Sequence, residues 1–386
     1  VGSEMCIRDR FKISKEITFR AGKTVRKVSI RKGRCMMERC DQDLAFMLQY
    51  ENVAWYENGK VRILDRRIYP TEVKFVECTT YKEVAQAITD MVTQSAGPYT
   101  AAGMGMALAA HEVEGKTEEE QIKFLTQASY DISHARPTTA NRMGIITEGC
   151  LKVAKEALAE GKSAVEACFN RTVDSLNRRY TTMGKVGENL AALFPKNGTI
   201  LTQCFGETII GMMLRAARKN NNDIKIFCAE TRPYLQGARL TSTCCAQMGF
   251  DTTVITDNMV AYSMQHKGID LFTSAADTIA RDGHIANKIG TFQISILAKY
   301  FGIPYYVTGI PDEDKMYGKD IVIEERDPAQ VLSYRGIPNT IPEVKGIYPS
   351  FDIVPPHLIS GVVTDKGVYV PYLLNDYFKG EVKDFY

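Results

Sequence analysis

Two residues stand out as candidates for acid–base chemistry, Cys204 and Asp277, because each follows a short apolar segment of the chain. Cys204 directly precedes a segment with helical character. The backbone N–H groups and the dipole of a helix N-terminus favour a thiolate at such a position. A cysteine placed there can transfer protons or act as a nucleophile. The alternative is a buried cysteine that serves as a small apolar side chain.

Asp277 follows the apolar residues 271–276. A carboxylate at the end of a buried strand loses part of its hydration, which raises its pKa into a range useful for proton transfer. By its position alone, Asp277 fits a helix cap or a loop aspartate better. Cys204 and Asp277 together, at the ends of two strands of one sheet, make a stronger case for a catalytic site than either residue alone.

Other kinds of site have little support in the sequence. The five histidines include no H-x-x-x-H pair and the cysteines no paired C-x-x-C, so we expect no metal. The phosphate-loop pattern G-x-x-x-x-G-K-[ST] is absent. Gly103-Met104-Gly105 lies in an expected helix rather than after a strand, which makes it weak evidence for a dinucleotide. We therefore expect no cofactor.

The second half of the chain carries the elements that would position both candidates. Expected strands cover 199–203, 224–229, 252–256, 271–275 and 305–308, and expected helices cover 206–219, 236–248, 259–266 and 289–300. This alternation predicts an α/β fold with a Rossmann-like, doubly wound parallel sheet over residues 196–386. Ligands of such sheets bind beyond the carboxyl ends of the strands, so residues 230–233 and 257–258 are further candidates.

Residues 11–195 are predicted to form a mostly helical domain with a small antiparallel sheet. Asn58-Gly59 suits the type I′ turn of a hairpin over 55–64. Thr79 and Thr80 can cap a helix over 81–93, and Gly97-Pro98 is expected to break the chain before a helix at 101–111. Further helices are expected from Thr117, at 139–160 and at 162–180. Residues 1–10, VGSEMCIRDR, are interpreted as an adapter or cloning scar.

Composition excludes several classes of protein. The 386 residues carry 48 Lys and Arg against 46 Asp and Glu, which argues against a general nucleic-acid binder. No stretch approaches the apolar run of about 18 residues that a membrane helix needs, which rules out a membrane-spanning protein. Ten cysteines are too sparse for a disulfide scaffold and no signal peptide is visible, so we expect reduced thiols and a cytoplasmic protein.

Six ordered motifs between about residue 62 and residue 369 resemble those of methylthioribose-1-phosphate isomerases. They are ETRPYLQGARL at 230–240, DNM at 257–259, AAD at 275–277, ANKIGT at 286–291, IEERDP at 323–328 and SFDIVP at 350–355. The superfamily also holds ribose-1,5-bisphosphate isomerase and the regulatory subunits of the eukaryotic translation-initiation exchange factor. The resemblance implies a cofactor-free, homodimeric aldose–ketose isomerase of the methionine-salvage type. It would convert S-methyl-5-thioribose 1-phosphate, or a related 5-deoxypentose 1-phosphate, to the ribulose 1-phosphate.

The resemblance also implies roles for Cys204 and Asp277, which match the catalytic pair of the isomerases. By family pattern, the regulatory subunits do not keep this pair. Asp277 would transfer a proton at the ring oxygen or a hydroxyl, and Cys204 would handle the proton at carbon through an enediol-like intermediate. The sequence leaves open whether hydrogen moves as a proton or as a hydride.

The substrate-binding residues implied by the resemblance are Arg136, Gln236, Asn287, Lys288 and the segment Ser95-Ala96-Gly97. Arg136 would meet the phosphate. The family usually has Arg-Gly-Ala-Pro where this chain has Ser95 to Pro98, so Ser95 replaces a phosphate-binding arginine. This chain also departs from the family pattern at Phe205-Gly206-Glu207, Thr278 and His284.

These departures surround the expected pocket, so they leave the reaction class plausible and put the substrate in question. One alternative is a non-catalytic regulatory or sugar-phosphate- or nucleotide-sensing protein on the same fold, which the loss of the arginine at Ser95 supports. The other is ribose-1,5-bisphosphate isomerase, whose substrate carries two phosphates. The same loss argues against it.

Overall fold

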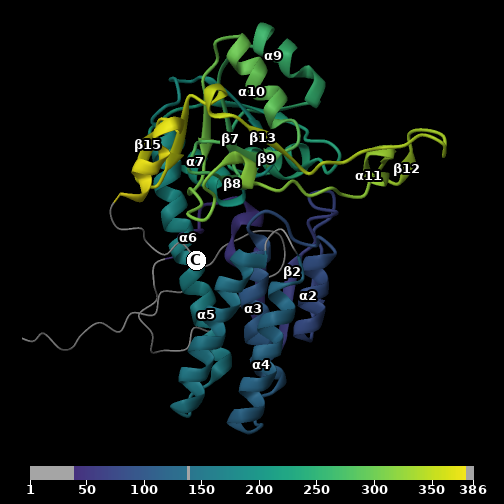
Figure 1. Cartoon of the computed structure of the whole chain (residues 1–386), viewed down its shortest axis with the longest axis vertical. Coiled ribbons are helices and arrows are strands. Elements are labelled where there is room, and N and C mark those ends of the chain that lie inside the picture. Colours follow the sequence, from purple (N-terminus) through teal and green to yellow (C-terminus); the bar gives the residue numbers. More distant parts are fainter. Residues whose placement is uncertain (1–38, 137–139, 380–386) are drawn as a thin grey trace, which may run out of the picture. The chain divides into compact units, whose positions relative to one another are not determined.

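A three-stranded antiparallel sheet and a set of packed helices make up the first described part of the chain. The structure, a computed structural model, describes residues 39–136 and 140–379 (Figure 1). The interpretation of residues 1–10 as a scar lies outside these ranges. The elements are η1 (Phe46–Leu48), α1 (Tyr50–Val53), β1 (Ala54–Glu57), β2 (Lys60–Leu64), β3 (Phe75–Cys78), α2 (Tyr81–Thr89), α3 (Gly97–Glu112), α4 (Glu118–Ser133), α5 (Ala140–Ala159) and α6 (Ala164–Ala191).

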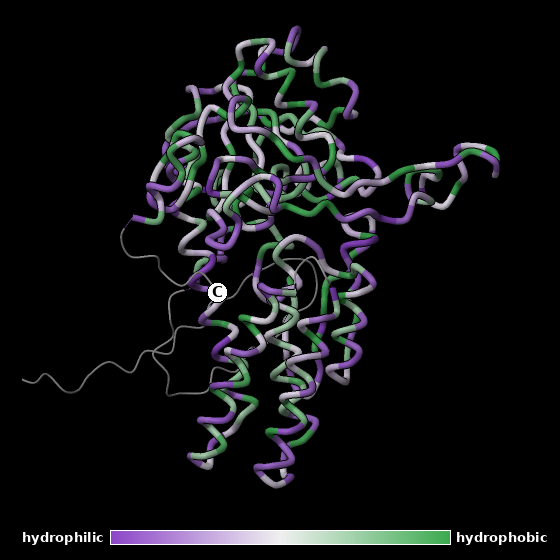
Figure 2. The backbone as a smooth tube through the Cα atoms, viewed as in Figure 1, coloured by the Kyte–Doolittle hydropathy of each residue, from purple (hydrophilic) through white to green (hydrophobic). Residues whose placement is uncertain are grey.

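Local sequence signals explain several of these boundaries. Asn58 and Gly59 both have positive φ, as a type I′ turn requires, and the hairpin is confirmed. Thr80 begins α2 with a capping box in which its hydroxyl accepts the Glu83 N–H. Hydrophobic and hydrophilic residues alternate along α4, α5 and α6 in Figure 2, which is typical of helices with one buried face.

Helix α3 begins earlier than the sequence predicts. Gly97-Pro98 was expected to break the chain, whereas these residues form the first turn of α3. The first turn of a helix tolerates proline because its missing N–H has no partner within the helix there. Helix α6 also runs past residue 180 to Ala191, because Met183, Val186 and Leu190 continue its buried face.

The second part of the chain holds a seven-stranded sheet in the order β15-β14-β10-β7-β4-β5-β6. Its strands are β4 (Thr199–Gln203), β5 (Lys225–Ala229), β6 (Thr252–Ile255), β7 (Ile269–Ala275), β10 (Tyr305–Thr308), β14 (Gly361–Thr364) and β15 (Gly367–Tyr369). All neighbours pair in parallel except β15, which runs antiparallel to β14. The α/β prediction is confirmed, with a mixed, mostly parallel sheet in place of a wholly parallel one.

Helices cover both faces of this sheet, because successive strand residues point to opposite sides. Ile200 packs into the cluster that also holds residues of α6 and α7, whereas the next residue, Leu201, packs with residues of α9 and α10. The helical elements are α7 (Glu207–Lys219), a π-helical turn η3 (Gly237–Thr241), α8 (Ser242–Gln247), η4 (Asp257–Met259), α9 (Val260–His266) and α10 (Thr291–Tyr300). None of the helices in the described ranges is long and apolar enough to cross a membrane.

A smaller antiparallel sheet, β13-β9-β8, follows the carboxyl end of β7. Its strands are β8 (Thr278–Ile279), β9 (Ile285–Lys288) and β13 (Phe351–Val354). The remaining elements are η5 (Gly318–Asp320), α11 (Ala329–Leu332), β11 (Ser333–Tyr334), β12 (Ile337–Pro338), η6 (Pro356–Leu358) and η7 (Pro371–Phe378). Figure 1 shows α11 and β12 on a segment that extends away from the sheets. The sequence predicts no strand between residues 276 and 304 and none after residue 308.

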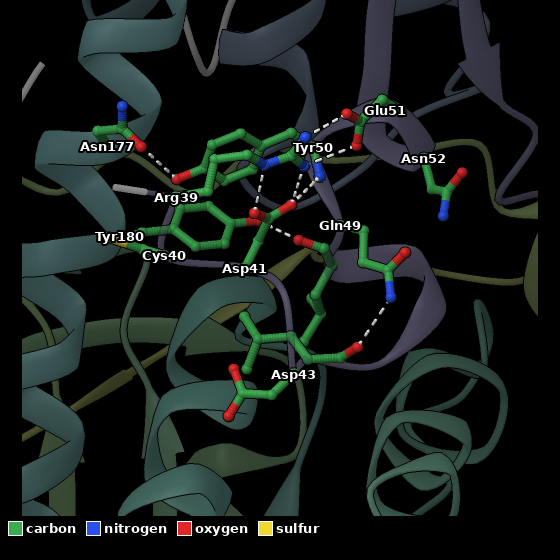
Figure 3. A network of polar contacts seen from close by, with 12 residues as sticks. Arg39, Cys40, Asp41, Asp43, Gln49, Tyr50, Glu51, Asn52, Asn177 and Tyr180 are labelled. Atoms are coloured by element: carbon green, nitrogen blue, oxygen red, sulfur yellow. Dashed lines mark hydrogen bonds and ion pairs between the residues drawn. The ribbon is translucent and has the colours of Figure 1, made fainter. Parts of the chain in front are cut away.

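A polar network ties the first described residues to α6 (Figure 3). The Asp41 carboxylate accepts hydrogen bonds from Arg39 and from the Tyr50 N–H at 2.7 Å. The Tyr50 hydroxyl donates to Asn177 Oδ1 at 2.7 Å, and the Tyr180 hydroxyl donates to the Leu48 carbonyl at 2.6 Å. The hydroxyls of Tyr50 and Tyr180 and the Asp41 carboxylate thus have partners, whereas the Asn177 amide nitrogen is buried without one among the described residues.

A fully buried ion pair joins the first half of the chain to α7. Both nitrogens NH1 and NH2 of Arg66 lie 2.9 Å from the two carboxylate oxygens of Glu207, and both side chains have zero exposure. Arg66 also donates to the Gln94 carbonyl at 2.7 Å. Contacts group the chain from Arg39 onward into one compact unit, and the domain boundary between residues 195 and 196 stays a prediction.

We expect Glu207→Gln to lower the free energy of unfolding by about 3–5 kcal/mol, because it leaves the Arg66 charge buried without a counter-charge. Glu77→Gln is the matched control. Its partner Lys60 lies 3.1 Å away and both side chains are more than half exposed, so the loss should be at most about 1 kcal/mol. Urea denaturation measures both variants. Equal losses would contradict the structural role of the buried pair.

Candidate active site

Cys204 and Asp277 lie at the point where the direction of the sheet reverses. Cys204 directly follows β4, and Asp277 follows β7, the strand that pairs with β4 in parallel. From β4 the chain proceeds outward to β5 and β6 and then returns to β7 on the other side. Open α/β sheets bind ligands in the crevice at such a switch point, beyond the carboxyl ends of the strands. The topology therefore brings the two predicted residues to one edge of the sheet.

The backbone of Cys204 is held in a left-handed conformation, with φ of 62°. Its N–H donates to the Thr231 hydroxyl at 2.9 Å, and its carbonyl accepts from the Thr241 hydroxyl. Asp257 in turn accepts the N–H groups of Thr231 and Arg232 at 2.8 and 2.7 Å. Asp257, a sequence candidate for chemistry, therefore has the role of fixing the loop against which Cys204 rests.

The protonation of Cys204 differs from the sequence expectation. Burial raises the pKa of the thiol to about 11, although the positive charge of Lys288 opposes the rise. The expected thiolate was wrong because desolvation outweighs the dipole of α7, whose first residue lies three positions further on. At neutral pH the site holds a thiol, which can donate a proton.

Asp277 is exposed to solvent, although protein atoms surround it on several sides. This enclosure raises its pKa above the ordinary value of 3.8, while Lys288 and the arginines 136, 142 and 326 oppose the rise. Its N–H donates to the Ala286 carbonyl at 2.8 Å, which joins Asp277 to the smaller sheet. At neutral pH Asp277 is a carboxylate of enhanced basicity beside a protonated thiol.

Lys288 and Asn287 end β9 and are almost fully buried, with 4% and 3% exposure. Burial lowers the pKa of Lys288, whereas the nearby Cys204 and Asp277 raise it. Lys288 Nζ lies 4.3 Å from the centre of the Phe351 ring, in cation–π contact. The Asn287 amide donates to Gln203 Oε1 at 3.3 Å, next to Cys204 in sequence. Both residues therefore lie beside the catalytic candidates.

Gln236 and Arg136 approach from two other segments. Gln236 directly precedes η3, and its buried side-chain oxygen has no hydrogen-bond partner among the described residues. Such an oxygen can accept a hydrogen bond from a bound ligand. Arg136 follows α4, and its charge acts on Asp277. Burial and the charge of Arg326 lower the pKa of Arg136.

The segment Ser95-Ala96-Gly97 leads into α3 and contacts the loop after Cys204. The Ser95 hydroxyl accepts the N–H of Glu207, the first residue of α7, at 3.2 Å and donates to the Phe205 carbonyl at 3.1 Å. Ala96 accepts a hydrogen bond from Arg179. Ser95 therefore caps α7 and brings no charge to the site.

Sequence reasoning assigned no role to Glu324, Arg326, Tyr348 and Ser350. The charge of Arg326 acts on Cys204, Asp277 and Lys288, which places it at the same site. The IEERDP motif was noted as a resemblance, but an isolated run of charged residues is usually solvated, so nothing else in the sequence marked it. Within the described ranges, no three His, Cys, Asp or Glu side chains gather as a metal site would require.

A family model described as the initiation factor 2 subunit family matches residues 94–371. The chain belongs to this family. It is 34% identical to the methylthioribose-1-phosphate isomerase of Chloroflexus aurantiacus, over 82% of this chain and 94% of that protein. The Bacillus pumilus protein of the same name is also 34% identical, over 82% of this chain and 92% of that protein.

Solved structures within this family carry two different names. The 5-methylthioribose 1-phosphate isomerase of Pyrococcus horikoshii has a TM-score of 0.74 and 30% identity, over 85% of this chain and 95% of that one. The structure titled translation initiation factor eIF-2B, subunit delta, from A. fulgidus has a TM-score of 0.72 and 30% identity, over 84% and 99%. Similarity alone therefore does not decide between an isomerase and an initiation-factor subunit, and the chemistry of the site must distinguish them.

We expect Cys204 to react slowly with iodoacetamide at pH 7.5, because the thiolate is the nucleophile and the thiol pKa is about 11. The labelling rate, measured by peptide mass spectrometry, should rise about tenfold per pH unit toward pH 11. Lys288→Gln removes the charge that lowers this pKa, so labelling at pH 9 should slow further. Fast labelling at neutral pH with a plateau below pH 8 would show a stabilised thiolate instead.

Proposed function

We propose that the chain is an aldose–ketose isomerase that converts S-methyl-5-thioribose 1-phosphate, or a related 5-deoxypentose 1-phosphate, to the ribulose 1-phosphate. The observation that carries this proposal is the thiol of Cys204 and the carboxylate of Asp277 at the ends of two adjacent parallel strands. Identity of 34% to proteins named methylthioribose-1-phosphate isomerase supports the substrate class. The reaction requires no redox partner, and we propose that it takes place in the cytoplasm.

One acid and one base suffice for the proposed reaction. The Cys204 thiol donates its proton to the ring oxygen as the bond between C1 and that oxygen breaks. The resulting thiolate removes the proton from C2, which gives an enediol-like intermediate with a C1–C2 double bond. The thiol then returns this proton to C1 while the Asp277 carboxylate accepts the proton of the C2 hydroxyl, which leaves the C2 ketone. Proton transfer from Asp277 to Cys204 restores the starting state.

The surrounding charges suit this sequence of steps. Lys288 lowers the pKa of both Cys204 and Asp277, so it stabilises the thiolate that forms after ring opening. A bound substrate would displace the water that reaches Asp277, and loss of this water strengthens its basicity. The buried oxygen of Gln236 supplies an acceptor for a sugar hydroxyl.

A second function has support in the solved structures. The likeness to a protein titled as an exchange-factor subunit fits a non-catalytic, sugar-phosphate-sensing protein on the same fold. Ser95, which adds no charge to the site, fits this function as well. The enclosed thiol beside a carboxylate favours the enzyme, because a sensor needs neither group for binding.

We expect turnover of S-methyl-5-thioribose 1-phosphate in an assay that detects the ketose product. The value of kcat/KM should fall as pH drops through the raised pKa of Asp277, because the base is then protonated. It should also fall as pH rises toward 11, because the acid is then lost. Between these limits the profile should be flat.

Two variants complete this test. Cys204→Ser and Asp277→Asn should lower kcat by at least about a hundredfold, the usual contribution of a general acid or base, and leave substrate binding measurable. Cys78→Ser is the matched cysteine control, because Cys78 is buried in β3, in the three-stranded sheet of the first part of the chain. Full activity in Cys204→Ser would exclude this mechanism, and binding without turnover in the wild type would favour the sensor.

We further propose that the protein forms a homodimer. Five large apolar residues are exposed on η4, α9 and α10, namely Met259, Tyr262, Phe292, Ile296 and Tyr300. An apolar group of this kind often marks a protein–protein contact. Light scattering at micromolar concentration should give twice the mass of the chain, and Ile296→Glu should reduce it to the mass of one chain. A wild-type monomer would contradict the proposal.

A further inference from the structure

A short antiparallel ladder leads into β13 of the smaller sheet and lies beside the site. The Arg326 N–H donates to the Tyr348 carbonyl, and the Ser350 N–H donates to the Glu324 carbonyl, both at 2.9 Å. Glu325 and Pro349 pair between them. We call this pairing of residues 324–326 with 348–350 the ladder. The residues between its two strands, 327–347, form the segment that carries α11 and β12.

The ladder continues into the strands that hold the catalytic candidates. Ser350 directly precedes β13, and β13 pairs with β9, so that Phe351 lies opposite Lys288. Strand β9 pairs in turn with β8, which begins one residue after Asp277. The backbone of Arg326 is therefore connected through three successive pairings to the backbone beside Asp277.

One face of the ladder points into the site. Side chains alternate along extended strands, and residues directly opposite each other share a face. Glu324, Arg326, Tyr348 and Ser350 therefore lie on the same face. They are buried or half-buried, whereas Glu325 between them is exposed. The Arg326 side chain is only 10% exposed, and its charge reaches Cys204, Asp277 and Lys288.

This face carries positive charge and buried polar atoms without hydrogen-bond partners in the described part of the chain. Arg326 contacts Glu324 through its Nε alone, at 3.2 Å from Oε1. Glu324 Oε2 and the Ser350 hydroxyl are buried without a hydrogen-bond partner among the described residues. Arg326, Arg136 and Lys288 are close enough that Arg326 disfavours the charged form of the other two. A gathering of cations that repel one another is stabilised by a multiply charged anion.

We propose that the ladder is a wall of the substrate site, in which Arg326 binds the substrate phosphate and Glu324 and Ser350 bind a sugar hydroxyl. This inference rests on the proposed function, because it takes a sugar phosphate as the ligand. Arg326 offers a planar guanidinium to phosphate oxygens. Its Nε donates to Glu324 Oε1, and this hydrogen bond orients the guanidinium. The hydroxyl of Ser350 and the free oxygen of Glu324 complete the wall.

Calorimetric titration with inorganic phosphate and steady-state kinetics with S-methyl-5-thioribose 1-phosphate test this assignment. Arg326→Gln should weaken phosphate binding at least about tenfold and raise KM by a similar factor, since it removes a charge-assisted hydrogen bond. Arg326→Lys should recover part of the binding, because it restores the charge without the fork. Arg335→Gln is the matched control: Arg335 is exposed between β11 and β12 and should change neither value.

Ser350→Ala provides a second measurement that does not depend on charge. It should raise KM by about twofold to tenfold with little change in phosphate binding, because it removes one neutral hydrogen bond. Wild-type phosphate binding and KM in Arg326→Gln, with the fold checked by circular dichroism, would overturn the assignment.

The same experiment separates this inference from the proposed function. If the wild type binds phosphate but isomerises none of the pentose 1-phosphates, and Arg326→Gln loses that binding, the ladder is a binding wall in a protein that is not this isomerase. If the wild type isomerises the substrate and Arg326→Gln keeps the wild-type KM and phosphate affinity, the isomerase stands and the ladder assignment fails.

Discussion

The buried ion pair between Arg66 and Glu207 constrains the two segments next to Cys204, namely the start of α7 and the segment at Gln94 and Ser95. Glu207 is the first residue of α7, so the pair fixes the start of the helix that follows Cys204. Arg66 also holds the Gln94 carbonyl, and the next residue, Ser95, caps α7. Two segments that are distant in sequence are therefore locked to the same turn. A buried pair of this kind adds little net stability, but it tolerates only one arrangement of its neighbours.

Desolvation, more than helix dipoles, determines the chemistry available at the site. The thiol of Cys204 stays protonated because burial destabilises the thiolate more than the nearby positive charges stabilise it. The same enclosure makes the Asp277 carboxylate a better base. The two groups thereby acquire opposite roles at neutral pH from a shared environment. Lys288 opposes the rise in pKa of both Cys204 and Asp277, so less free energy is needed to deprotonate the thiol.

The sequence predicted the parts of the fold that follow from local patterns. The alternation of strands and helices after Gly198 located β4, β5, β6, β7 and β10, and the rule that ligands bind beyond strand ends selected Cys204 and Asp277. The strands β8, β9 and β13 were not predicted, because they are two to four residues long and pair with segments that no local pattern identifies. The ion pair between Arg66 and Glu207 was not predicted either, because the two residues are 141 positions apart in the sequence.

The thiolate was mispredicted because a strand end signals a helix dipole but not the depth of the surrounding protein. Part of that depth comes from later segments, such as the one that holds the buried Tyr348, which interacts with Cys204. Arg326 had no recognisable role in the sequence, because the side of the strand on which its side chain lies is set by the pairing of residues 324–326 with 348–350. Residue types can be read along the chain, whereas enclosure and facing direction belong to the assembled structure.

The ladder has a consequence for the order in which a newly made chain becomes competent. Contacts between residues far apart in sequence require the closure of long loops, which slows their formation relative to local structure. Synthesis delivers Cys204 and Asp277 early, and β4 and β7 can pair once both are present. The strand that pairs with Arg326 includes Ser350 and is synthesised later. A nascent chain therefore contains Cys204 and Asp277 well before it contains the ladder, and translation that stops between these points yields β4, β5, β6 and β7 without the ladder.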